Sequence, residues 1–572
     1  MGLGLRKIFT IITSVLLTMI SVAAQPLAGT EKEIFASGNS IRIHYKTQSF
    51  NDERVVFCKY YSFFHQCGMP NLPLIRDYVI IPKKSKPQFN VIVNHKIGKN
   101  NVFISQSKPK TIDSDNVADS VCNSSYDAQS MLLPTTNGIM TKILEFSTFD
   151  LLFFEVYPFQ YNPAQKILSV ADDIAIEISF SNVLKRQNAI AITPLEKSFC
   201  MQAVNFKEVA KSFSTAVDSF PNYVIVTHSQ FTQAADTLAL WKAQQGYSTR
   251  VFAQDHWTSD SIRNLMLSIY AVIASRPTYL CLLGDTAFVS ATEKIAPPPI
   301  PEAFSTDLYY TTMDSDTDMT PNFGCGRISV NSPEQALSVV GKLVRFQKYP
   351  PTSSTYYTHM VNCSFFQDDD LNGYDDRRFA QTSEEIRDYL QTNYSKNVSR
   401  IYEAPVASNP QFWNNDDYAN GSALPADLLR PAFGWNGNTS DIVNALNQGT
   451  FLMLHRDHGY SNASGWAHPQ LASSQLQYLT NDSLLPLIFS INCYSGNYRV
   501  EESFGEKLLR QPAGASGIFA PSYYSYSGNN DAFVLGLYDA LFPSPGLIPQ
   551  FTGIGGNHSA VFSTHGLINK PG

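Results

Sequence analysis

The feature that most constrains this 572-residue chain is a change in the spacing of its apolar residues near residue 220. Before that point, short apolar runs such as 78–81, 89–93 and 102–104 are separated by polar breaks, and within 174–180 every second residue is apolar. A period of two is typical of a strand with one buried face. The pattern predicts an all-β, sandwich-like domain.

After residue 221 the pattern becomes one of strands alternating with helices. Segment 232–245 has apolar residues at helical spacing, and Ser332-Pro333 has the residue types that begin a helix. Repeated strand–helix units predict a mostly parallel sheet with helices on both faces. Four runs are almost continuously apolar and favour buried strands: 223–227, 278–283, 450–454 and 487–491.

The N-terminus has the pattern of a secretory signal peptide. Arg6 and Lys7 precede an apolar run over residues 8–20, and small residues follow just before Gln25. The apolar run is short for a membrane-spanning helix, and no later run is long enough for one. We therefore expect a secreted or cell-surface protein with no membrane span in the mature chain.

These patterns divide the chain into four parts. We expect a signal peptide over residues 1–24, the β-sandwich domain over 25–183, a connector over 184–220 and an α/β domain over 221–572. The connector contains several Lys and Arg residues, which suggests a processing region.

Composition excludes some classes of protein. With 44% hydrophobic and 16% charged residues, the chain can form sizeable cores. Its net charge is −7 and it has no long run of Lys or Arg, so we expect no nucleic-acid partner.

Two polar motifs follow two of the buried runs. His458-Gly459 follows run 450–454, and Cys493 follows run 487–491. The carboxyl ends of parallel strands meet at one edge of a sheet, so the two motifs should meet there. An imidazole can take the proton of a thiol and make it nucleophilic, and the backbone N–H groups of Gly459 and Cys493 are candidate donors to an oxyanion. His455 is an alternative base, and an inert buried thiol is the alternative for Cys493.

The motifs HGYSNASGW, SINCYSGN, SFGEKLLR, STDLYY and GCGRISV resemble the gingipain family of cysteine endopeptidases, within the caspase-like clan. In the first half, CGMPNLPLIRDYVIIP and VYPFQYNPAQ resemble the pro-domain of that family. The resemblance implies a caspase-like α/β catalytic domain and a zymogen. It also implies protein or peptide substrates, and no cofactor for catalysis.

Asp307, in STDLYY, matches an aspartate near the active site of that family. The resemblance implies that Asp307 either supports His458, as the third member of a triad, or lines the specificity pocket. Asp285 is the next candidate. Asp457 is less favoured because adjacent side chains of an extended segment diverge.

The resemblance also implies structural calcium. Asp368, Asp370 and Asn372 are spaced as in the first half of an EF-hand loop, but its twelfth position is Phe379 instead of Glu. Asp314, Asp316 and Asp318 form a second alternating set. For both sets a solvated turn is the alternative interpretation.

Two other functions remain as alternatives to a cysteine endopeptidase. The chain could be a catalytically silent adhesin or carrier with the same fold. It could also be a sortase-like transpeptidase, which forms the same thioester but passes the acyl group to an amine.

Overall fold

The structure is a computed structural model, and it describes most of the chain between residues 30 and 547. The predicted signal peptide lies outside the described residues. The described residues are 30–37, 39–47, 62–63, 68–107, 126–146, 149–181, 190–192, 196, 200–201, 203–210, 213–215, 222–296, 301–315, 321–414, 421–542 and 547.

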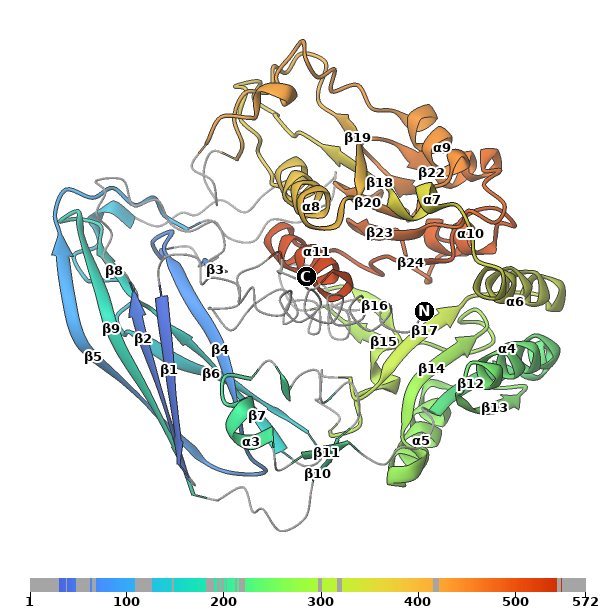
Figure 1. Cartoon of the computed structure of the whole chain (residues 1–572), viewed down its shortest axis with the longest axis horizontal. Coiled ribbons are helices and arrows are strands. Elements are labelled where there is room, and N and C mark those ends of the chain that lie inside the picture. Colours follow the sequence, from blue (N-terminus) through green and yellow to red (C-terminus); the bar gives the residue numbers. More distant parts are fainter. Residues whose placement is uncertain are drawn as a thin grey trace, which may run out of the picture.

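The first half forms two antiparallel β-sheets (Figure 1). In one sheet the strand order is β1-β2-β9-β5, with β8 also paired to β9; the other has the order β3-β4-β7-β6. The bounds are β1 (Thr30–Ser37), β2 (Ser40–Thr47), β3 (Ser62–Phe63), β4 (Pro73–Pro82), β5 (Pro87–Lys99), β6 (Gly138–Glu145), β7 (Phe149–Val156), β8 (Phe159–Asn162) and β9 (Ile167–Phe180).

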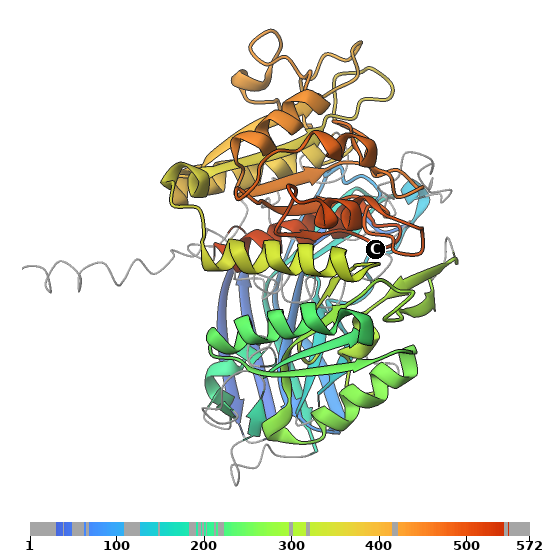
Figure 2. The same ribbon diagram turned by 90° about the vertical axis from the view of Figure 1, so that its right-hand side faces the viewer.

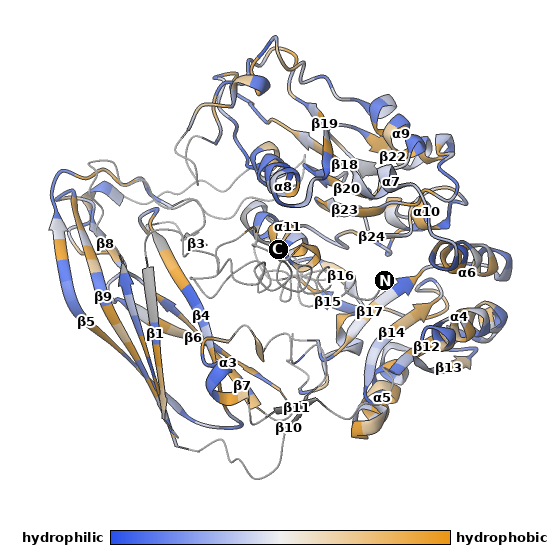
Figure 3. Ribbon diagram, in the orientation of Figure 1, coloured by the Kyte–Doolittle hydropathy of each residue, from blue (hydrophilic) through white to orange (hydrophobic). Residues whose placement is uncertain are grey.

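The two sheets pack face to face through the alternating residues predicted from the sequence. Ile174, Ile176 and Ile178 of β9 are buried together with Val79 of β4 and Phe154 of β7. Figure 3 shows the resulting alternation of hydrophobic and hydrophilic residues along these strands. The predicted β-sandwich is therefore confirmed, although residues 102–104 are not in a strand.

The described part of the connector contacts both halves of the chain. It contains β10 (Ile190–Ile192), paired in parallel with β11 (Phe213–Thr215), and the short helix α3 (Phe206–Val209). The Asn205 side chain donates to the carbonyl of Ile80 and accepts its N–H, both at 2.9 Å. This contact attaches the connector to the edge of β4.

The second half has two parallel sheets, where the sequence pattern suggested one. Their orders are β13-β12-β14-β17 and β19-β18-β20-β23-β24. The bounds are β12 (Asn222–His228), β13 (Ser248–Gln254), β14 (Pro277–Leu283), β17 (Gly324–Ile328), β18 (His359–Phe365), β19 (Asn397–Glu403), β20 (Leu452–Arg456), β23 (Leu487–Ile491) and β24 (Gly517–Phe519).

Helices cover both faces of each parallel sheet, as predicted. On the first sheet α4 and α6 pack on one face and α5 on the other; on the second, α9 and α10 pack opposite α8 and α11. The bounds are α4 (Thr232–Gln244), α5 (Ser259–Tyr270), α6 (Pro333–Lys348), α7 (Ser354–Thr358), α8 (Phe379–Tyr394), α9 (Thr439–Gln448), α10 (Phe504–Arg510) and α11 (Ser527–Leu541).

Short antiparallel pairs and 3-10 turns complete the second half. The strand pairs are β15 (Thr292–Ile295) with β16 (Ala303–Thr306) and β21 (Gly465–Trp466) with β22 (Leu471–Ala472). No helix among the described residues is both long enough and apolar enough to cross a membrane.

Helix α6 lies at the junction of the two parallel sheets (Figure 2). Its Ser332 cap and Pro333 start are as predicted, because Ser332 accepts the N–H of Gln335. The buried ammonium of Lys342 on α6 donates to the carbonyls of Leu509 and Gln511, at the end of α10, at 2.6 and 2.8 Å. The two sheets are thus joined through α6 and α10.

Candidate active site

His458 and Cys493 are placed at the same level by the pairing of two adjacent parallel strands. Arg456, the last residue of β20, pairs with Ile491, the last residue of β23. His458 and Cys493 therefore each lie two residues beyond a matched pair, at the carboxyl edge of the sheet. The structure thus brings the two predicted motifs together.

Gly459 shows how closely the two loops approach each other. A Cβ atom at this position would lie 2.1 Å from the carbonyl oxygen of Cys493, a distance that no side chain can occupy. The missing Cβ of this glycine thus makes room for the loop that carries Cys493.

His458 is oriented by a residue that the sequence analysis did not identify. Its Nε2 atom lies 2.9 Å from Oε1 of Gln367, two residues beyond the end of β18. The ring also packs edge-on against Phe379, with the ring centroids 5.2 Å apart. Because the amide oxygen of Gln367 can only accept, this contact places the imidazole proton on Nε2 and leaves Nδ1 as the basic nitrogen.

Cys493 is fully buried, and its sulfur contacts the segment before α11. The N–H of Ser525 donates to Sγ at 3.2 Å, and the Ser525 hydroxyl donates to the carbonyl of Asn492. An N–H donor next to the sulfur stabilises negative charge on it. Ser525 therefore supports both the sulfur and the backbone that carries it.

The residue after the nucleophile has an unusual backbone. Tyr494 has a φ of 57°, which non-glycine residues seldom adopt, and the N–H of Ser495 donates to the Cys493 carbonyl at 2.7 Å across it. Its ring packs against Tyr523 and Tyr524, with centroid distances of 5.5 and 4.7 Å. Strain of this kind persists only where the surroundings enforce it, and it is concentrated at functional sites.

His455, the alternative base, has a structural position. Its Nδ1 lies 2.9 Å from the amide nitrogen of Asn492, its Nε2 lies 3.2 Å from the carbonyl of His468, and its ring stacks on Trp466. Burial lowers its pKa well below the usual value, so the ring is neutral. Its Nδ1 accepts a hydrogen bond from the Asn492 side chain. The Asn492 side chain in turn accepts a hydrogen bond from the hydroxyl of Ser495, in the loop that carries Cys493.

Asp307 forms a buried ion pair with Arg327, and its role as a triad member or a pocket residue stays a prediction. Its two carboxylate oxygens accept from Nε and Nη2 of Arg327 at 2.9 and 2.7 Å, and both side chains are buried. Arg327 also donates to the carbonyls of Gly284 and Val289. The carboxylate thus helps to fix β17 against the loop after β14. The contact with His458 that we expected from Asp307 is made by Gln367.

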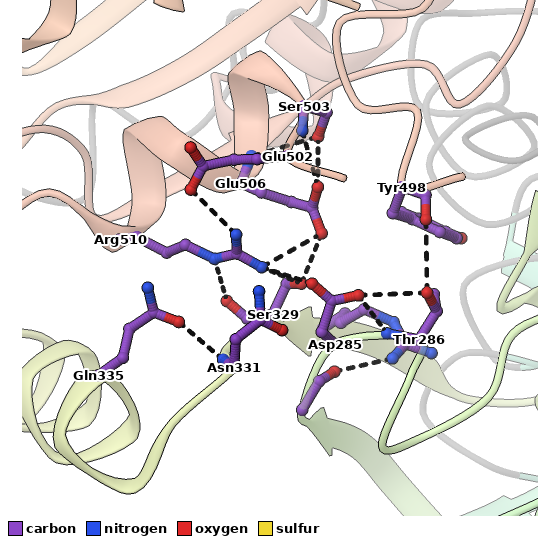
Figure 4. Close-up of polar contacts among 12 residues, drawn as sticks. Asp285, Thr286, Ser329, Asn331, Gln335, Tyr498, Glu502, Ser503, Glu506 and Arg510 are labelled. Atoms are coloured by element: carbon purple, nitrogen blue, oxygen red, sulfur yellow. Dashed lines mark hydrogen bonds and ion pairs between the residues drawn. The ribbon is translucent and has the colours of Figure 1, made fainter. Parts of the chain in front are cut away.

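Asp285, the next candidate, also has a structural role (Figure 4). Its Oδ2 atom lies 2.6 Å from Nη2 of Arg510 on α10, and Arg510 further contacts Glu502 and the carbonyl of Ser329. This buried cluster connects the first sheet to α10. Asp457 is used locally, accepting the N–H of His468 at 2.7 Å.

The candidate calcium ligands form a compact turn. The Asp368 carboxylate accepts the N–H groups of Asn372 and Gly373, and Asp370 contacts the Asn372 side chain. Asp316 and Asp318 lie outside the described residues, whereas Asp314 accepts from Asn322. Within the described residues no group of three or more His, Cys, Asp or Glu could hold a metal ion, so structural calcium remains a prediction.

Three supporting residues were missed: Gln367, Asn492 and Ser525. A signal for Gln367 was present, because the largely apolar run 360–366 ends directly before it, as in the other strand-end motifs. Asn492 directly precedes Cys493, but nothing in the sequence indicated its contact with His455. Ser525 had no local signal, since its contact depends on tertiary packing.

Comparison with known proteins identifies the family. The model of peptidase family C25 matches residues 217–561, which is more than half of the chain. This chain belongs to peptidase family C25. The model of the C25 propeptide matches residues 49–213. The chain therefore combines a region of peptidase family C25 with a region that matches the propeptide of that family.

The curated relatives come from Porphyromonas gingivalis. The chain is 24% identical over 421 residues to Lys-gingipain W83, covering 71% of this chain and 22% of the relative. It is 21% identical over 479 residues to gingipain R1, covering 79% of this chain and 43% of the relative. The chain thus spans only about a fifth to two fifths of the length of these relatives.

Solved structures include a crystal structure of the Arg specific cysteine proteinase gingipain R, with a TM-score of 0.47 and 18% identity over 63% of this chain and 78% of that one. A complex of Porphyromonas gingivalis pro- and mature domains has a TM-score of 0.46 and 17% identity, covering 61% of this chain and 77% of that one.

Proposed function

We propose that this protein is an endopeptidase that cleaves peptide bonds through a thioester on Cys493, with His458 as its acid–base partner. The observation that carries the proposal is the meeting of the two strand-end loops, with Nδ1 of His458 as the basic nitrogen. The sulfur attacks the substrate carbonyl carbon while its proton passes to His458. The developing oxyanion then needs donors.

The amide of Gly459 is suited to be one of these donors. The bridge between Gly459 and Trp466 uses the N–H groups of Tyr460 and Ala467, which leaves the Gly459 amide out of it. The backbone N–H of Cys493 is the second candidate. Donors fixed in a folded backbone need no reorganisation as charge develops on the oxygen.

The reaction then closes in two steps. The carbon–nitrogen bond breaks as His458 returns its proton to the leaving amine, which leaves an acyl thioester on Cys493. Water then gives a proton to His458 and attacks the thioester, and carbon–sulfur cleavage releases the acid and restores the thiol. Neither step requires a metal or an organic cofactor.

We further propose that the chain is exported and made as a zymogen. Export is supported by the N-terminal sequence pattern, and the zymogen by the propeptide match. Its substrates would then be extracellular proteins or peptides. The relatives are named for lysine or arginine, and whether that preference extends to this chain is considered below.

The direct test is labelling with a thiol-reactive peptide probe, followed by turnover of a peptide library. We expect labelling at Cys493 that is lost in Cys493→Ala and strongly reduced in His458→Ala, with both variants keeping the wild-type thermal transition. Persistent turnover in Cys493→Ala would contradict the assignment. Mass spectrometry of the products separates a hydrolase from a transpeptidase, and absence of both labelling and turnover would favour the adhesin or carrier.

A further inference from the structure

A fully buried arginine lies beneath the proposed active site. Arg456 ends β20, two residues before His458, and its exposed fraction is 0%. Its Nη2 atom donates to the carbonyl of Ser527 at 3.0 Å and to Oδ1 of Asp531 at 2.9 Å. Its guanidinium also lies over the ring of Phe379, 4.5 Å from the centroid.

These contacts link the guanidinium to neighbours of both the base and the nucleophile. Phe379 packs against His458 on one side. On the other side, Ser527 is two residues from Ser525, whose N–H contacts the sulfur of Cys493. Two residues of chain span at most about 7 Å, so the guanidinium lies near the segment that contacts the nucleophile.

Among the described residues, the charges around Arg456 balance. Arg378 lies 3.1 Å from Glu385 and 3.9 Å from the second oxygen of Asp531. With Arg456, this makes two guanidinium groups and two carboxylates, and all four side chains are at most 8% exposed. A buried charge requires a partner, and here each charge has its partner inside the fold. Among the described residues, the group thus leaves neither a carboxylate for a basic substrate side chain nor a cation for an acidic one.

We propose that Arg456 takes the place at Asp531 that a basic substrate side chain would otherwise take, so that this peptidase selects an uncharged residue at P1, the residue on the amino side of the cleaved bond. The aromatic rings of Tyr494 and Tyr523, packed around Cys493, favour the same kind of side chain. The inference rests on the proposed peptidase function and gives its substrate class. It separates this chain from relatives named for lysine or arginine.

The test expresses the full-length protein, allows it to be processed, and measures on one peptide library which P1 residues wild type and variants cleave after. Wild type should cleave after uncharged residues, and peptides with Arg or Lys at P1 should be cleaved at least tenfold more slowly. Arg456→Ala leaves the Asp531 carboxylate in place without its guanidinium, so cleavage after Arg, relative to the best uncharged residue, should rise at least tenfold. Millimolar guanidinium chloride should suppress that gain, because the free ion refills the site.

The double variant Arg456→Met/Asp531→Asn is the matched control. It removes both charges, so it should fold as wild type does and show no gain at Arg or Lys. If wild type prefers Arg or Lys at P1, the proposed specificity is wrong while the proposed peptidase function stands. This measurement does not depend on any variant folding. A folded Arg456→Ala with an unchanged profile would also overturn it. No turnover of any peptide by wild type would instead overturn the proposed function, and this inference with it.

Discussion

At the residue scale, the identity of Gln367 is the main chemical departure from an acid-containing triad. A carboxylate next to imidazole orients the ring and also stabilises its charged form. The amide of Gln367 can orient the ring and fix its tautomer, but it adds no charge. Gln367 therefore contributes to this site by positioning the His458 ring.

Substitutions at Gln367 separate orientation from charge. Gln367→Ala should lower kcat by about 10–100-fold with little change in KM, because the ring loses its fixed orientation. Gln367→Glu keeps the acceptor and adds a negative charge that favours the imidazolium. The alkaline limb of its pH–rate profile should therefore move to higher pH. Wild-type kcat in Gln367→Ala would remove this residue from the site.

Gly459 offers a second test, of the close approach between the two strand-end loops that carry His458 and Cys493. Gly459→Ala should lower kcat/KM by about 100-fold or more, since the new Cβ displaces the Cys493 carbonyl and with it the nucleophile. The matched control is Gly341→Ala in α6, where a Cβ meets nothing within 4 Å and should stabilise the helix by about 1 kcal/mol. Equal activity of the two variants would contradict this account.

The sequence predicted the proposed reacting pair, His458 and Cys493, better than the residues that position this pair. His458 and Cys493 follow apolar runs, and parallel strands bring such ends together without further information. The partner of the base could not be assigned in this way. Asp307 is held by Arg327, and that ion pair depends on how β17 packs against the β14 loop.

At the element scale, periodicity predicted strands and helices but not how the strands are grouped. The alternation in β9 and the capped start of α6 were both visible in the sequence. The division into two parallel sheets was not, because pairing depends on contacts between distant segments. The cluster of Asp285 and Arg510 connects the first sheet to the neighbouring helix α10 (Figure 4).

That cluster should account for a measurable part of the stability. Arg510→Met leaves the buried Asp285 and Glu506 carboxylates without their cation, so the free energy of unfolding should fall by about 3–5 kcal/mol. The control is Arg345→Met, whose exposed ion pair with Asp482 should contribute less than about 1 kcal/mol. Urea unfolding of the two variants measures both values, and equal losses would contradict a structural role for the cluster.

At the scale of the whole molecule, the connector is attached to both halves. Cys200 and Ala203 are buried against the β-sandwich, and Asn205 holds Ile80. The fully buried Glu196 accepts from the hydroxyl of Tyr270, on α5 of the α/β half, at 3.1 Å. A protease needs exposed backbone, so these buried residues are poor places to cut.

The packing of the connector narrows the predicted processing window of residues 184–220. We expect N-terminal sequencing of the active form to find a start between residues 211 and 220, beyond α3, with the propeptide released as one piece that extends at least to Val209. Because Glu196 contacts Tyr270, the cleaved propeptide should stay bound until it is displaced, and Glu196→Ala should release it faster in size-exclusion chromatography. Glu145→Ala, at an exposed ion pair with Lys83 on the β-sandwich, is the matched control and should leave the release rate unchanged. A mature start within residues 200–205, or an active enzyme that remains intact across the connector, would contradict this account.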